Sequence, residues 1–117
     1  MKNNKEDFII TDEDVKIDGI DFSEKYARHL KNHPDELKYY KEHISKEYNQ
    51  TRDKNLLLEG LKIVAMAEGK VSDMAKNANV KRTSVYRMLS KDANPSFDSI
   101  VSFAGDVGIN FNACLAR

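Results

Sequence analysis

Apolar residues recur every three or four positions along most of the chain beyond residue 21, which is the period of amphipathic helices. This pattern predicts about five or six helices and contains no run of about 18 apolar residues that would span a membrane. The predicted helical segments are 22–32, 34–48, 54–68, two short helices within 71–90, and 96–108. We therefore predict a small all-α protein.

Local signals predict where these helices begin and end. His33-Pro34 separates the first helix from the second, because proline suits the first turn of a helix and disfavours helical geometry in the residue before it. The segment 54–68 is the most apolar, so we expect it to lie at the centre of the core. The candidate caps, linker and stops are Asp21 or Ser23, residues 49–53 with Asp53 as a cap, Gly69, Ser96 and Gly108.

Residues 71–90, VSDMAKNANVKRTSVYRMLS, have the spacing of a helix-turn-helix. Ala75 is the small residue where the two helices cross, and Asn79 lies where the turn needs a left-handed backbone. We expect Val80 to anchor the turn in the core. The full set of predicted inward positions is Met74, Ala75, Ala78, Val80, Val85, Met88 and Leu89.

The outward positions of the same segment are basic and polar. Between residues 70 and 91 there are six Lys and Arg residues against one acid, Asp73, an excess typical of a face that contacts phosphates. We predict that Arg82 and Arg87 read bases in the major groove of a double-stranded DNA operator. The complete set of candidate DNA contacts is Lys70, Ser72, Lys76, Lys81, Arg82, Thr83, Tyr86, Arg87, Ser90 and Lys91. The same apolar spacing also occurs in helical bundles that bind no DNA.

The net charge of zero conceals a polarised chain. Residues 1–60 carry 11 Lys and Arg against 14 Asp and Glu, whereas residues 61–117 carry 8 against 5. We expect residues 1–21 to form an acidic arm, either merely solvated or suited to a basic, partly apolar protein surface. The candidate partner contacts in this arm are Phe8, Ile9, Asp12, Glu13, Asp14 and Ile17.

Other chemistry is weakly represented. His29 and His33 have the spacing of two ligands on one helix face, but Pro34 disfavours helical geometry at His33. We therefore expect that they do not share a regular turn and that no acid completes a ligand set, and we predict neither a metal nor a cofactor. The single cysteine, Cys114, is assigned no chemistry. No catalytic triad, paired-acid or glycine-rich phosphate pattern is present, so we expect no enzymatic activity.

The segment from about residue 56 to 111 resembles the antidote proteins of HigA-type addiction modules, also called toxin–antitoxin modules. These are helix-turn-helix proteins related to phage repressors. The resemblance rests on Val85-Tyr86-Arg87, Leu89-Ser90, Asn94-Pro95, Phe97-Asp98 and Gly108 at their spacing in this sequence. Two positions depart from the family: Lys81 replaces the usual Ser or Thr cap, and Ser72 replaces a frequent Gln.

The resemblance implies an all-α, repressor-like DNA-binding domain that is usually dimeric, represses its own operon and neutralises a small, basic, ribonuclease-like toxin. We divide the chain into the acidic arm 1–21, a helical extension 22–52 and a helix-turn-helix domain 53–117. The alternatives are a repressor without a toxin and a helical module that binds only protein. We expect the protein to act in the cytoplasm. One helix-turn-helix covers one half-site, so we also expect a homodimer. Its predicted contacts are Phe103, Ile109 and Phe111.

Overall fold

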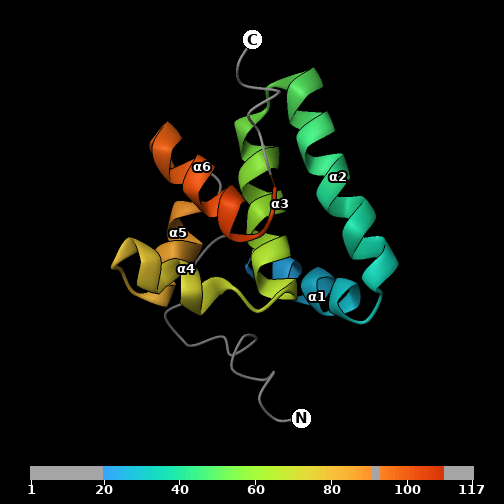
Figure 1. Cartoon of the computed structure of the whole chain (residues 1–117), viewed down its shortest axis with the longest axis horizontal. Helices are drawn as coiled ribbons and strands as arrows, with labels where there is room; N and C mark the ends of the chain where they lie inside the picture. Colours follow the sequence, from blue (N-terminus) through green and yellow to red (C-terminus); the bar gives the residue numbers. More distant parts are fainter. Residues whose placement is uncertain (1–19, 91–92, 110–117) are drawn as a thin grey trace.

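The computed structural model describes residues 20–90 and 93–109. Within these ranges the chain forms six helices and no strand: α1 (Ile20–Lys31), α2 (Pro34–Thr51), α3 (Lys54–Ala67), α4 (Val71–Ala78), α5 (Arg82–Met88) and α6 (Phe97–Asp106) (Figure 1). The all-α prediction is confirmed. The described helices include none with the length and apolar character needed to cross a bilayer. The acidic arm as far as residue 19, Lys91, Phe111 and Cys114 lie outside the described residues.

Helix α3 is the centre of the core, as its composition predicts. Leu58, Leu61 and Val64 are fully buried, and α1, α2 and α6 all pack against this helix. Figure 1 shows α3 between α2 and α6, with α1, α4 and α5 gathered at one end of it. Gly60 lets α2 approach closely, because a Cβ atom there would lie 2.9 Å from the side chain of Ile44.

Most of the predicted helix boundaries are confirmed. The Asp53 side chain accepts hydrogen bonds from the backbone N–H groups of Asn55 and Leu56 at 3.0 and 3.3 Å, and Ser96 accepts one from Ser99 at 3.1 Å. Such caps satisfy the first N–H groups of a helix. Gly69, with a φ of +67°, follows the end of α3.

Two predicted boundaries are wrong. Helix α1 already begins at Ile20, so Asp21 and Ser23 lie inside it rather than capping it. The linker predicted over 49–53 is shorter, because α2 continues to Thr51. Arg52 then takes a left-handed conformation with a φ of +59° and donates its N–H to the Tyr48 carbonyl at 2.8 Å, which ends the helix.

The apolar residues near the turn and in α6 face directions other than those predicted. Ala78 and Val80 are exposed, and the exposed fraction of Val80 is 38%. The prediction that Val80 anchors the turn in the core is therefore wrong. Phe103 and Ile109, predicted as dimer contacts, are instead buried. They fill the space between α6 and the rest of the bundle, and the core therefore leaves neither of them for a partner.

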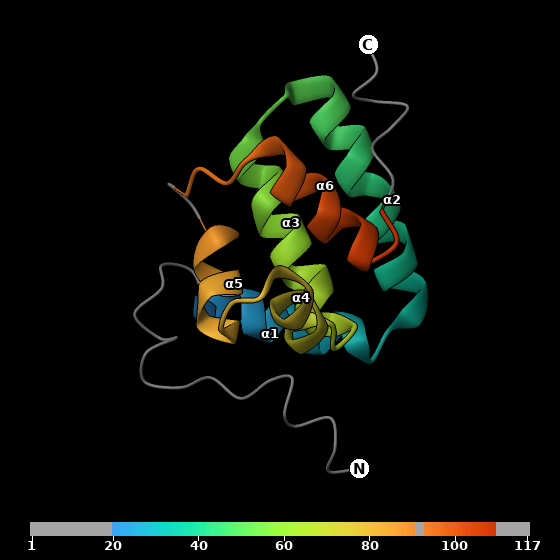
Figure 2. The ribbon, with the colours of Figure 1, turned by 60° about the vertical axis from the view of Figure 1, so that its left-hand side comes forward.

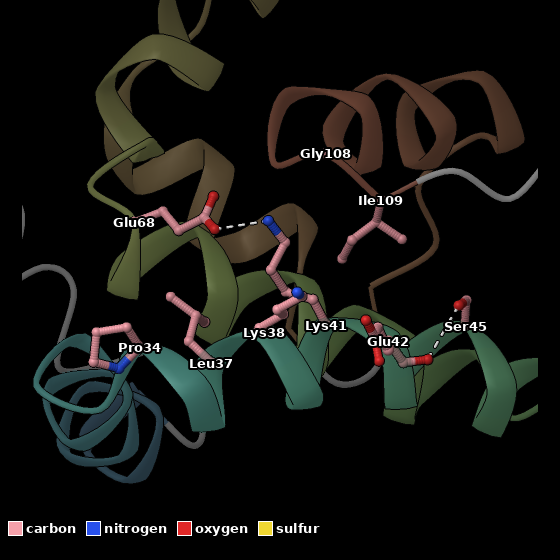
Figure 3. Close-up of a pocket in the computed structure, with 9 residues that line it drawn as sticks. All are labelled: Pro34, Leu37, Lys38, Lys41, Glu42, Ser45, Glu68, Gly108 and Ile109. Carbon is pink, nitrogen blue, oxygen red and sulfur yellow. Dashed lines mark hydrogen bonds and ion pairs between the residues drawn. The ribbon is translucent and has the colours of Figure 1, made fainter.

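A groove of about 430 Å³ lies between α2 and the residues that follow α6 (Figure 3). Lys41 of α2 donates to the Glu68 carboxylate at 2.8 Å across it, and Leu37, Gly108 and Ile109 also line it. Gly108 has a φ of +78°, which turns the chain after α6 back toward α2. The groove therefore separates α2 from the residues that follow α6, and the Lys41–Glu68 hydrogen bond spans it.

The corner between α1 and α2 corrects our prediction about the histidines. The rings of His29 and His33 stack with their centroids 4.2 Å apart, although His33 lies outside the helix as predicted. The Nδ1 atom of His33 lies 2.7 Å from the carbonyl oxygen of His29, and an acid, Glu36, lies beside both rings. The connection of two residues between the helices brings these side chains together despite Pro34.

Candidate nucleic-acid interface

The turn between α4 and α5 fixes how the two short helices cross. Asn79 has a φ of +58° and a ψ of +46°, the left-handed conformation that its position predicts. The Val80 N–H donates to the Ala75 carbonyl at 2.9 Å, which closes the end of α4. Figure 2 shows α4 and α5 beside each other at one end of α3. The turn therefore holds α5 in a fixed orientation against the bundle.

The inward face of α5 includes a residue that we predicted to face DNA. Val85, Tyr86 and Leu89 are all buried, and Tyr86 is the largest fully buried side chain in the described structure. Positions i, i+1 and i+4 share one side of a helix, so a tyrosine next to Val85 and three residues before Leu89 turns inward with them. The prediction that Tyr86 contacts DNA is wrong.

Arg82 follows Tyr86 toward the core. It lies one turn earlier on the same helix and is half-buried, with its Nη2 atom 3.1 Å from the Tyr86 hydroxyl and its Cζ atom 5.6 Å from the ring centroid. A buried tyrosine hydroxyl needs a polar partner, and the guanidinium supplies it. In this structure the charged group of Arg82 packs on its own helix, and the role of Arg82 in reading bases stays a prediction.

The remaining outward face of α5 is narrower than predicted. Lys81 and Arg87 are exposed, and Thr83 and Ser84 are partly exposed. Thr83, Ser84 and Arg87 occupy positions i, i+1 and i+4, opposite the buried stripe. Our sequence analysis missed Ser84. Its spacing of three residues before Arg87 places the two residues on the same side of the helix, and this spacing could have identified it. Ser90 donates its hydroxyl to the Arg87 carbonyl at 2.8 Å and so closes the end of the helix.

Helix α4 also carries exposed polar and basic side chains. Ser72 and Lys76 are exposed, and Lys70, which immediately precedes the helix, is partly exposed. Lys81 precedes α5 with a backbone in the extended region and no side-chain cap, as the departure from the family pattern predicts. Asp73 is the acid on α4. We call the set Ser72, Lys76, Lys81, Thr83, Ser84 and Arg87 the basic face.

These observations define a small all-helical protein in which two short crossed helices carry exposed basic side chains. Residues 26–115 match the family model described as probable addiction module antidote protein. The match covers more than half of the chain, and the protein belongs to this family. It also extends the resemblance at 56–111 toward the N-terminus, across α2. No curated protein and no solved structure matched the chain significantly.

Proposed function

We propose that this antidote protein binds the operator DNA of its own operon through α4 and α5, which act as a helix-turn-helix, and neutralises a small basic toxin. The observation that carries the proposal is the basic face, with Lys76, Lys81 and Arg87 exposed on two crossed helices. Membership of an antidote family supports an antitoxin over a repressor without a toxin. The proposed activity is repression and neutralisation in the cytoplasm, without catalysis.

The basic face divides into two kinds of DNA contact. Arg87 lies in the last turn of α5, where a guanidinium has the reach and the paired donors to contact O6 and N7 of guanine. Lys76 lies in the last turn of α4 and Lys81 immediately precedes α5, so both lie near the turn and suit contacts with phosphates. Ser72, Thr83 and Ser84 supply short donors and acceptors between them. Only Arg87 is therefore expected to specify a base strongly.

Replacing Arg87 by alanine is expected to lower specific operator affinity by about 1–3 kcal/mol and to relax one base position. The matched control is Arg52→Ala, which removes the same charge from the connection at the opposite end of α3 (Figure 1). Titration of labelled operator DNA measures both affinities. Equal affinities for wild type and Arg87→Ala, or an equal loss in the control, would remove Arg87 from the groove.

We place the contact with the toxin on the acidic arm, from its composition. Residues 6–24 contain eight acids and one lysine, with apolar residues between them. Long-range attraction from such a segment increases the rate of encounter with a basic partner, and desolvated apolar contacts slow separation. The arm is also remote in sequence from the basic face, so one chain has separate segments for DNA and for toxin.

Reversing the charge of Asp12 and Glu13 to lysine is expected to slow association with the toxin encoded beside this protein by about tenfold at low salt. Ile17→Asp is expected to accelerate dissociation instead. The control reverses Asp35 and Glu42, two exposed acids of α2. Stopped-flow association and dissociation rates test the assignment, and equal slowing by both double variants would assign the effect to net charge alone.

We also propose a homodimer, with a contact different from the one predicted. Val80 and Phe97 are exposed by 38% and 58%, and Ala78, Val80 and Met88 line a shallow groove of about 310 Å³ beside α6. We call the groove residues Ala78, Val80 and Met88, together with the exposed Phe97 that begins α6, the turn patch. Val80 of this patch directly precedes Lys81. A second copy bound there would place two α5 helices near each other, as two adjacent half-sites require.

A further inference from the structure

A cluster of ligand-type side chains lies at the corner between α1 and α2, and none of its members is among the residues assigned to DNA or toxin. The Nε2 atom of His29 lies 2.7 Å from the Oε1 atom of Glu36. The ligand atoms of His29, His33 and Glu36 all lie within 4.8 Å of one another, and all three residues are exposed to solvent. Among the described residues this cluster joins the end of α1 to the first turn of α2.

The backbone fixes the orientation of His33. Its Nδ1 atom lies 2.7 Å from the His29 carbonyl oxygen, which only accepts hydrogen bonds. The proton of a neutral His33 ring must therefore be on Nδ1, and Nε2 keeps its lone pair. Histidines that bind metals commonly have this arrangement, with one ring nitrogen donating to a carbonyl and the other facing the ion.

Aromatic packing helps to hold His29 in place. Its ring stacks with the ring of Tyr26, at a centroid distance of 6.1 Å, and with the ring of His33. Tyr26 in turn packs edge-on against Tyr40 of α2 at 5.4 Å. The two helices therefore hold His29 within reach of Glu36. The hydrogen bond with His29 lowers the pKa of Glu36.

We propose that His29, His33 and Glu36 bind one zinc ion, with water completing a tetrahedral site. Zinc accepts imidazole nitrogen and carboxylate oxygen at about 2.0–2.2 Å, which places neighbouring ligand atoms about 3.3 Å apart. The His29–Glu36 separation is 2.7 Å and no pair of the three ligand atoms is more than 4.8 Å apart, so small rotations of exposed side chains would form the site. His29 would bind the ion through Nε2 as a neutral ring whose proton is on Nδ1, in place of its hydrogen bond with Glu36, and the ion would link α1 to α2. This inference is independent of the proposed DNA and toxin binding.

The test is calorimetric titration of the full chain with zinc chloride at neutral pH, together with the unfolding temperature at each zinc concentration. We expect one zinc per chain and a higher unfolding temperature, because the ion binds the folded state. His33→Ala and Glu36→Gln should each weaken binding by at least about tenfold. Both residues are exposed, and circular dichroism will show that the variants keep their helices.

Two controls separate this site from other zinc ligands in the chain. The Nε2 atom of His43 lies 3.2 Å from the Oε1 atom of Glu47 on the same α2, but this pair has no second histidine, so His43→Ala should leave zinc affinity unchanged. Cys114→Ser tests the thiol and should also have no effect. The proposal is overturned if zinc does not bind below about 1 mM. It is equally overturned if His33→Ala and Glu36→Gln bind like wild type, or if either control loses the site.

Discussion

Replacing Tyr86 by alanine is expected to lower the free energy of unfolding by about 3–5 kcal/mol, a large part of the stability of a domain of this size. The reason is that Tyr86 is fully buried between α5 and the rest of the core, so its removal leaves a cavity beside Val85 and Leu89. It also removes a hydrogen-bond partner of Arg82. Urea denaturation followed by circular dichroism measures the change.

Tyr86→Phe is the matched control, because it keeps the ring and removes only the hydroxyl that Arg82 contacts. Its expected cost is about 0.5–1.5 kcal/mol, the usual net value of one hydrogen bond. Operator binding by Tyr86→Phe should equal that of wild type. If Tyr86→Ala keeps its stability but loses operator binding, the tyrosine belongs to the DNA contact and our description of α5 is wrong.

The double variant Val80→Asp with Phe97→Asp is expected to be monomeric and to bind its operator at least about 100-fold more weakly. Charges in the turn patch would have to be desolvated on association, which is costly without partners. A single half-site then supplies only part of the specific contacts, and specific recognition totals roughly 4–10 kcal/mol. Sedimentation and operator titration measure the two effects separately.

Tyr39→Asp is the control for this variant. Tyr39 is an aromatic residue of α2 with an exposed fraction of 69%, and it lies outside the turn patch. It should leave both the oligomeric state and operator affinity unchanged. A wild-type chain that is monomeric on operator DNA, or a double variant that still dimerises, would place the contact elsewhere on the molecule.

Features that depend on a few neighbouring residues could be predicted from the sequence. Asp53 and Ser96 cap their helices because a short side chain reaches N–H groups two or three residues ahead. Asn79 takes the left-handed conformation because few other residues tolerate it at low cost. The central place of α3 followed from apolar residues on more than one of its faces. Each of these depends on local chemistry alone.

Features that depend on packing could not be predicted in the same way. Helix α5 has only seven residues, so its sequence is compatible with two inward faces, one that includes Tyr86 and one that leaves Tyr86 exposed. In the folded protein the aromatic ring of Tyr86 is buried, and Arg82, one turn earlier, is half-buried. Phe103 was predicted as a dimer contact because the sequence does not show the space between α6 and α3 that its side chain fills.

The histidine corner was missed for a related reason. The effect of Pro34 on His33 is local and was predicted correctly, but the stacking of His29 on His33 depends on how two residues redirect the chain between α1 and α2. Glu36 then enters from the first turn of α2. The spacing of one helix indicates the His29–His33 pair, but it does not indicate that Glu36 of α2 joins them.

The most direct test of operator binding by the basic face is a titration of the full chain against the DNA upstream of its own gene and against scrambled DNA of equal length, over a range of salt concentrations. We predict an affinity at least about a thousandfold higher for the upstream DNA, and an affinity for both DNAs that falls steeply with salt. The salt slope should decrease by about one when Lys76 or Lys81 is replaced by alanine. Equal affinities for the two DNAs, or a salt slope unchanged by both lysine variants, would contradict operator binding by α4 and α5.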